Sequence, residues 1–224
     1  MILKYFLFLT ELVGTIAFSV SGVLTAKRQK LDLFGALVLG MVTATGGGVL
    51  RDILMGHTPP VMFQRPVYAA LALVTALAAF HIEKKSRLLE DSRKAVYLLN
   101  AADTIGLAVF AVSGTETVIA AAQEDNMFLA VFVGVITAVG GGILRDILAG
   151  RIPVVMRRRV YAVAALIGAV LYYLLRQTFG IQLFIAEVIS IAVIMLIRFL
   201  AIHYLWNLPG FEENSHDKQT AGNQ

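Results

Sequence analysis

Seven apolar segments, each close to the length that crosses a lipid bilayer, dominate the sequence. A membrane-spanning helix needs about 20 mostly apolar residues. Segments of this kind cover residues 3–26, 32–56, 67–82, 95–122, 127–150, 159–176 and 180–205. Because 58% of the residues are hydrophobic and only 15% are charged, the chain has more apolar surface than a soluble domain of this length buries. The sequence therefore predicts an all-α polytopic membrane protein with seven transmembrane helices.

A glycine-rich motif occurs twice inside these segments, once from Gly46 to Leu54 and again from Gly140 to Leu148. Three consecutive glycines disfavour a helix, and an Arg-Asp pair is costly against lipid. We therefore expect the second and fifth helices to be broken at these triplets, which are Gly46, Gly47, Gly48, Gly140, Gly141 and Gly142. A broken helix leaves backbone carbonyls free to contact cations, those of Gly46 and Gly140 among them. The alternative is that the glycines only let helices pack closely.

The duplication extends beyond the motif. Glu11 corresponds to Asp103, Ser21 to Ser113 and Tyr68 to Tyr161. Residues 3–82 and 95–176 therefore form two three-helix repeats, and the helix at 180–205 stands outside them. Three is an odd number, so the second repeat enters the membrane from the other side, and the repeats are inverted. We expect one transmembrane domain over residues 1–206 and a disordered polar tail over residues 207–224.

Charged residues lie at matching depths in the two repeats. We expect two ion pairs, Glu11 with Arg51 and Asp103 with Arg145, which could close a pathway at either end or could simply satisfy buried charge. Asp52 and Asp146 should point away from the neighbouring arginines, either to contact an ion or to bond backbone. Hydroxyls suited to a hydrated lumen are those of Ser19, Ser21, Thr43, Thr45, Ser113 and Thr137, although such groups commonly bond their own helix. For Glu116 the sequence names no partner.

Several classes of function are disfavoured. The chain has no cysteine, and its four scattered histidines lack metal-ligand spacing. Zincin, nucleophile-elbow and phosphate-loop motifs are absent, so we expect neither an enzyme nor a cofactor. Basic residues gather in alternate loops, which predicts the N-terminus outside and the C-terminus in the cytoplasm. The net charge of +4 thus reflects membrane orientation and contact with lipids, with no nucleic-acid footprint.

The duplicated Gly-Gly-Gly-x-Leu-Arg-Asp motif and the three-plus-three-plus-one pattern resemble the bacterial branch of the trimeric intracellular cation channel family. That family is also described as one of predicted glycine transporters. The resemblance implies a homotrimer in the bacterial inner membrane, with an hourglass pore in each subunit. It also implies that kinked second and fifth helices bound the pore, which passes K⁺ and Na⁺. A secondary transporter for glycine or another small amino acid fits inverted repeats equally well.

Overall fold

The fold is a bundle of long helices. The computed structural model describes residues 2–86, 92–121, 126–157, 160–204 and 206. Seven helices in these ranges are long and apolar enough to cross a membrane, which confirms the predicted class. They are α1 (Ile2–Arg28), α2 (Leu33–Leu54), α4 (Val67–Ser86), α5 (Ser92–Ala120), α6 (Met127–Leu148), α8 (Val160–Tyr173) continued by the π-helical turn η1 (Leu174–Thr178), and α9 (Leu183–His203). The predicted tail lies outside the described residues.

Two short helices follow α2 and α6 at equivalent places. They are α3 (Val61–Gln64) and α7 (Val154–Arg157). The helices before them begin and end alike: Asp32 caps α2 by accepting from the Gly35 amide, and Asn126 caps α6 by accepting from the Leu129 amide. After each helix a glycine with positive φ, Gly56 or Gly150, turns the chain. The same local chemistry therefore builds both halves.

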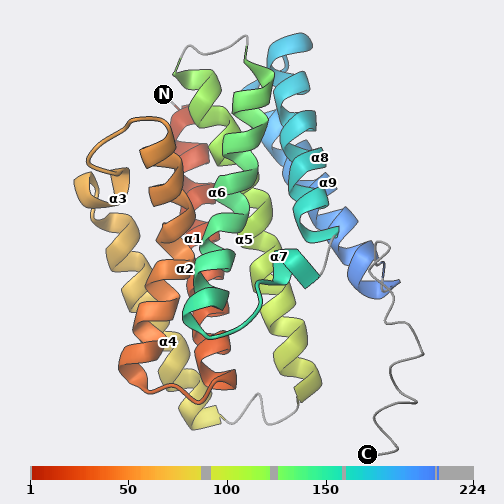
Figure 1. The fold of residues 1–224 in the computed structure, drawn as a ribbon. Coiled ribbons are helices and arrows are strands. Elements are labelled where there is room, and N and C mark those ends of the chain that lie inside the picture. Colours follow the sequence, from red (N-terminus) through yellow and green to blue (C-terminus); the bar gives the residue numbers. More distant parts are fainter. Residues whose placement is uncertain (1, 87–91, 122–125, 158–159, 205, 207–224) are drawn as a thin grey trace, which may run out of the picture.

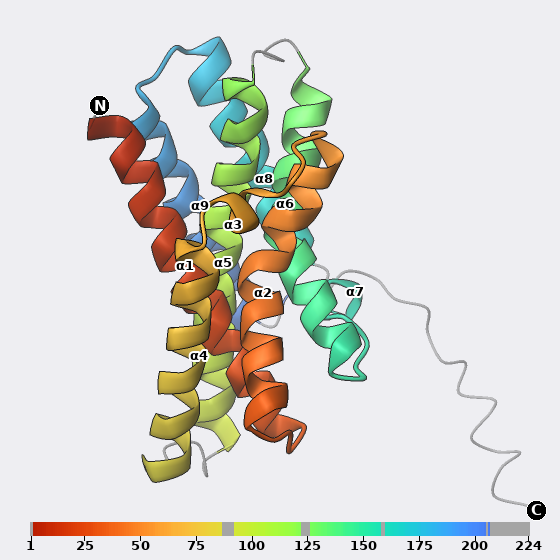
Figure 2. The same ribbon diagram turned by 90° about the vertical axis from the view of Figure 1, so that its left-hand side faces the viewer.

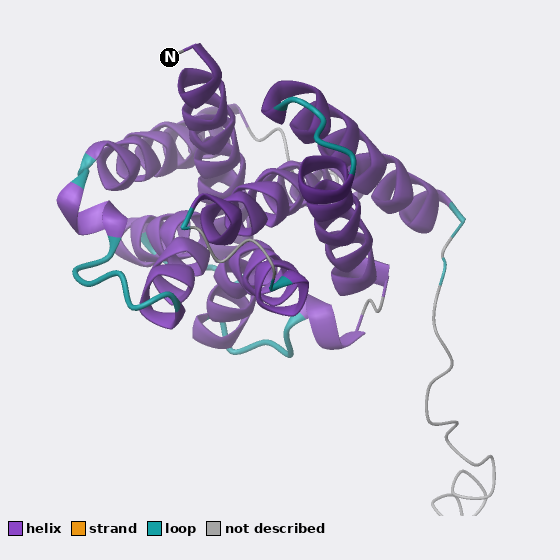
Figure 3. Cartoon of the chain, turned by 90° about the horizontal axis from the view of Figure 1, so that it is seen from above, coloured by secondary structure: helices purple, strands orange, loops and turns teal. Residues whose placement is uncertain are grey.

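The two halves run in opposing directions. In Figure 1, α1 starts near the top and runs downward, whereas α5 starts near the bottom and runs upward. We call the end where α1 begins the N-terminal face and the other end the opposite face, where α9 finishes (Figures 1 and 2). Helices α1, α2, α5 and α6 pack against one another, with α4 against α1 and α2, and with α8 and α9 against α5 (seen from above in Figure 3).

Both glycine triplets lie within continuous helices, so the expected break in α2 and α6 is wrong. Instead, the two helices cross where the triplets meet. A Cβ added to Gly47 would lie 2.1 Å from the Thr137 carbonyl oxygen, and one added to Gly141 would lie 2.1 Å from that of Thr43. Close backbone approach thus offsets the poor helix propensity of glycine. Carbonyls within a regular helix have intrahelical partners, which removes the reason for expecting free carbonyls at Gly46 and Gly140.

The three glycines of a triplet have different surroundings. The first meets a leucine of the facing helix: a Cβ on Gly46 would lie 2.7 Å from Leu144, and one on Gly140 would lie 2.8 Å from Leu50. The third glycine is less crowded, since a Cβ on Gly48 would have nothing nearer than 3.9 Å. The first two positions of each triplet therefore serve helix packing.

Candidate functional site

Glu11 of α1 lies at the centre of a polar group near the N-terminal face, which we call the Glu11 cluster: Glu11, Arg51, Asp52, Tyr68 and Ser113. The Arg51 guanidinium lies 3.8 Å from the Glu11 carboxylate. Tyr68 donates to the same carboxylate at 2.5 Å, and Ser113, which comes from α5, also donates to it. The predicted contact between Glu11 and Arg51 is thus present, as a long ion pair supported by two hydroxyls.

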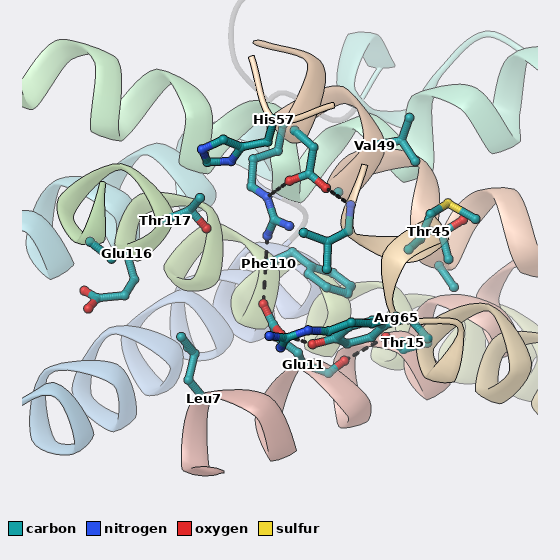
Figure 4. A pocket seen from close by; sticks show the side chains of 18 of the residues that line it. Leu7, Glu11, Thr15, Thr45, Val49, His57, Arg65, Phe110, Glu116 and Thr117 are labelled. Atoms are coloured by element: carbon teal, nitrogen blue, oxygen red, sulfur yellow. Dashed lines mark hydrogen bonds and ion pairs between the residues drawn. The ribbon is translucent and has the colours of Figure 1, made fainter. Parts of the chain in front are cut away.

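A cavity of about 590 Å³ opens beside this cluster. Figure 4 shows His57, Arg65 and Glu11 around it, with Phe110 deeper in the bundle. Its wall includes Thr15, Thr45, Gly48, Val49, Glu116 and Thr117, which come from α1, α2 and α5. The cavity therefore brings carboxylates, guanidinium groups and hydroxyls together inside a membrane-spanning bundle, where ionisable groups usually mark function.

Near the opposite face, Arg145 of α6 holds the matching polar group, which we call the Asp103 cluster: Asp103, Arg145, Asp146, Ser21 and Tyr161. Arg145 donates to Asp103 at 2.6 Å and to Ser21 at 2.5 Å. Ser21, on α1, donates in turn to Asp103. The Arg145 side chain is only 2% exposed. The second predicted pair is therefore also in contact, and it is short and fully buried.

The two aspartates that follow the arginines do not point away from them, contrary to the sequence prediction. Arg51 Nε donates to Asp52 at 2.9 Å, and Arg145 Nε donates to Asp146 at 3.0 Å. A long arginine side chain can fold back to the next residue even though adjacent Cβ atoms diverge on a helix. The second oxygen of each aspartate accepts from a backbone amide, that of Val61 or Val154. Each aspartate thus links its arginine to the short helix that follows.

The hydroxyls divide into two groups. Thr43, Thr45 and Thr137 donate to carbonyls four residues earlier on their own helices, which is the ordinary alternative to pore lining. Ser19 donates across to the Ala72 carbonyl of α4 at 2.7 Å. Only Ser21 and Ser113 bond to the charged clusters. Of the six residues whose hydroxyls were predicted to line a lumen, Thr45 lines the 590 Å³ cavity.

Between the two clusters the interior is filled. Phe18 of α1 and Phe110 of α5 lie with ring centroids 5.3 Å apart, and both are buried with Ala44 and Ala72. The crossing of Gly47 and Gly141 lies alongside, since the Gly141 position faces Phe18 at 3.6 Å. The cavity therefore stops at the bundle centre.

Glu116 has partners that the sequence did not indicate. Tyr172 of α8 donates to it at 2.9 Å, and Arg176 of η1 approaches it at 3.4 Å. Other residues of the cavity that sequence reasoning missed are His57, Arg65 and Tyr68. Tyr68 was recognisable as the repeat partner of Tyr161, but its bond to Glu11 depends on how α4 packs against α1.

Comparison with known proteins assigns the family. A family model described as glycine transporter matches the chain twice, over residues 8–84 and 100–177. The chain belongs to this glycine transporter family. The two matches fall on α1–α4 and on α5–η1.

A glycine transporter family relative, the UPF0126 inner membrane protein YadS of Escherichia coli K12, is 39% identical over 201 residues, which cover 90% of this chain and 94% of YadS. The UPF0126 membrane protein YvgT of Bacillus subtilis is 35% identical over 204 residues, covering 90% and 94%. This chain is a multi-pass membrane protein.

Solved structures identify the fold of this glycine transporter family member. The trimeric intracellular cation channel orthologue from Rhodobacter sphaeroides matches with a TM-score of 0.80 at 34% identity, over 89% of this chain and 98% of that one. A prokaryotic channel of the same kind, crystallised in 0.5 M KCl, matches with a TM-score of 0.81 at 30% identity, over 92% and 100%. Because these are channels and not enzymes, they confirm that the chain is not an enzyme.

Proposed function

We propose that the chain is a cation channel with its own pathway in each subunit, and that the pathway runs between α1, α2, α5 and α6. The observation that carries this proposal is the 590 Å³ cavity, which reaches from the N-terminal face to Phe110 and is lined by hydroxyls, by the guanidinium groups of Arg51 and Arg65 and by three carboxylates, those of Glu11, Asp52 and Glu116. Acidic side chains in a low-dielectric wall raise the local concentration of cations. The likeness to prokaryotic cation channels supports the same function.

The two halves are inverted repeats that share the pathway between them. Two crossed bonds support this arrangement: Ser113 of the second half donates to Glu11 of the first, and Ser21 of the first half donates to Asp103 of the second. Each charged cluster is therefore completed by the other repeat. A movement between the repeats would change both clusters together.

The described conformation is closed at the centre and at the opposite face. Opening requires α2 and α6 to separate at Gly47 and Gly141 and Arg145 to release Asp103. Separation would uncover the carbonyl oxygens of Thr43 and Thr137, which now lie against these glycines. A carbonyl has two lone pairs, so it can keep its helix bond and also contact a cation. The clusters then act as gates, and the crossing acts as the constriction that K⁺ or Na⁺ passes.

The subunits form a homotrimer in the inner membrane, with the N-terminus outside and the C-terminus in the cytoplasm. The excess of Lys and Arg in loops on the opposite face supports this orientation. The inner-membrane location of YadS and the trimeric channel orthologue from Rhodobacter sphaeroides support the location and the assembly.

Recordings from purified protein in planar bilayers test the proposal. We expect unitary current steps in KCl and NaCl, carried by cations. Glu11→Arg and Arg51→Glu should each abolish the steps, because each leaves two like charges together at the cavity. The double variant Glu11→Arg/Arg51→Glu should restore them. Lys94→Gln, which lies outside the cavity, is the matched control and should behave as wild type. Steps that persist unchanged in both single variants would contradict a gating role for the pair.

One observation favours a second function, a carrier for glycine or another small amino acid. The cavity opens to one face only and offers both a guanidinium, Arg51, and a carboxylate, Glu11. These groups match the two charges of a zwitterion. Saturable uptake of glycine into proteoliposomes, without unitary current steps, would favour the carrier over the channel.

A further inference from the structure

Glu187 is a buried glutamate on the first turns of α9, near the N-terminal face, and it belongs to neither charged cluster. The residue is only 1% exposed. Its Oε1 accepts from the Thr10 hydroxyl of α1 at 2.5 Å, whereas its Oε2 is buried without a hydrogen-bond partner in the described part of the chain. The arginine of the same helix, Arg198, is about 16 Å further along the axis. The carboxyl therefore has a hydroxyl as its partner where a buried charge calls for a cation.

The charges that surround this carboxyl are acidic. Helices α1, α5, α8 and η1 pack against α9, and Figure 2 shows α1 beside it. Two of these elements bring carboxylates that interact electrostatically with Glu187, namely Glu11 from α1 and Glu116 from α5. Tyr172 of α8 lies within the same reach, and Arg176 of η1 is engaged with Glu116. A negative charge on Glu187 would therefore be repelled by its neighbours as well as poorly solvated.

Ser190 supplies a second unpartnered group next to the carboxyl. Its Oγ is fully buried and has no hydrogen-bond partner among the described residues. Because residues three apart are neighbours on a helix surface, Ser190 and Glu187 share one face of α9. A carboxylate can only accept hydrogen bonds, whereas a protonated carboxyl also donates one. A proton on Oε2 gives Glu187 a donor that the Ser190 oxygen can accept, either directly or through one water.

We propose that Glu187 is a proton-binding site, and that its neutral carboxyl fastens α9 to α1 through Thr10. Release of the proton to water would place a third carboxylate beside Glu11 and Glu116, and the repulsion would push α1 away from α9. Thr10 directly precedes Glu11 in the chain, so this movement would reach the Glu11 cluster. The site thus makes the wall of the large cavity sensitive to pH, whichever solute the cavity takes.

Infrared spectroscopy of the full-length protein in detergent tests the proton directly, because a protonated carboxyl and a carboxylate absorb separately. At neutral pH we expect a protonated-carboxyl band in the wild type that disappears in Glu187→Gln. The matched control is Glu83→Gln. Glu83 is also a buried glutamate of a membrane-spanning helix, but Lys27 pairs with it at 2.6 Å, so its removal should leave the band unchanged. A wild type without the band, or a band that persists in full in Glu187→Gln, would overturn the proposal.

Thermal unfolding at two pH values tests the consequence for stability. The unfolded chain releases the proton of residue 187 as the pH rises, whereas the folded site retains it, so the wild type should lose stability toward alkaline pH. Glu187→Gln lacks this loss. We expect equal midpoints at acidic pH and a midpoint at least about 2 °C higher for the variant at alkaline pH. A difference between the two proteins that does not change with pH would overturn the proposal.

A second variant keeps the proposal falsifiable if Glu187→Gln does not fold. Thr10→Val preserves the shape of the side chain and removes the hydrogen bond that Oε1 accepts. The protonated-carboxyl band should remain in this variant but shift in frequency, since its carbonyl loses a donor. A band that does not move would show that the proton resides on another carboxyl and would overturn the assignment.

Discussion

The two charged clusters contain matching residues but differ in access to solvent. At the Glu11 cluster the ion pair is 3.8 Å long and faces a cavity of about 590 Å³. At the Asp103 cluster the pair is 2.6 Å long, and the arginine side chain is 2% exposed. Similar chemistry thus lines an open cavity near one end of the bundle and forms a buried, closely packed cluster near the other.

The difference arises from what packs around each half. The second half has α9 beside it, and a large buried apolar cluster joins residues of α5, α6, α8 and α9. Arg198 of α9 stacks on the ring of Tyr161 at 4.7 Å. The first half meets α9 less extensively, through α1, where Thr10 donates to Glu187. Tyr68, the counterpart of Tyr161, lines the cavity. A helix outside the two matching halves can therefore make the two charged clusters, which we propose as gates, differ in their access to solvent.

The largest difference between the clusters should follow removal of their arginines. Arg145→Ala leaves Asp103 and Asp146 buried without their cation, and we expect it to lower the free energy of unfolding by about 3–5 kcal/mol. Arg51→Ala should cost less, about 1–3 kcal/mol, because the Glu11 side chain is 17% exposed and faces the cavity, although Asp52 is as buried as Asp146. Denaturant titration in detergent measures both. Equal losses would show that the two clusters are equally buried.

A smaller effect should separate the glycines within one triplet. Gly47→Ala or Gly141→Ala places a Cβ 2.1 Å from a backbone oxygen of the facing helix, and we expect a cost of about 1–3 kcal/mol from overpacking. Gly48→Ala has open space and should be neutral or stabilise α2 by up to about 1 kcal/mol. The same titrations apply, with helix content followed by circular dichroism. A destabilising Gly48→Ala would contradict the distinction between packing and cavity positions.

The smallest effect should come from the crossed serines. Ser21→Ala removes both a donor to Asp103 and an acceptor for Arg145, and we expect a loss of about 1–3 kcal/mol because the guanidinium is buried. Ser113→Ala removes one donor to Glu11 and should cost about 0.5–1 kcal/mol, since cavity water can replace it. If Ser113→Ala proves the more harmful, the solvent access assigned to the clusters is reversed.

Sequence reasoning predicted the elements and the charged partners but not their packing. Hydrophobic length indicated the spans. The depth of each charged residue along its span indicated that Glu11 lies near Arg51, and the repeat extended this pairing to Asp103 and Arg145. Helix propensity alone suggested a break at the triplets, because local propensity takes no account of a facing backbone. The contact of Gly47 with the Thr137 carbonyl involves residues 90 positions apart, and no local pattern reveals it.

The sequence also did not predict that the two charged clusters differ in their access to solvent. Repeat symmetry predicts two equivalent ends, whereas the structure has one cavity beside Glu11 and a sealed cluster around Asp103. Glu116 shows the same limit, because its partner Arg176 lies on a π-helical turn that the sequence does not signal. What decides these features is how α8 and α9 pack.

The most direct test of one open and one sealed end uses the absence of native cysteine. Gly48→Cys and Gly142→Cys occupy equivalent repeat positions, and neither added Cβ would lie closer than 3.4 Å to a neighbour. Each variant, in sealed membranes and in detergent, is exposed to a membrane-impermeant thiol reagent. We predict fast labelling of Gly48→Cys from the N-terminal face and protection of Gly142→Cys from both faces. Comparable labelling of the two cysteines, or protection of both, would contradict the account.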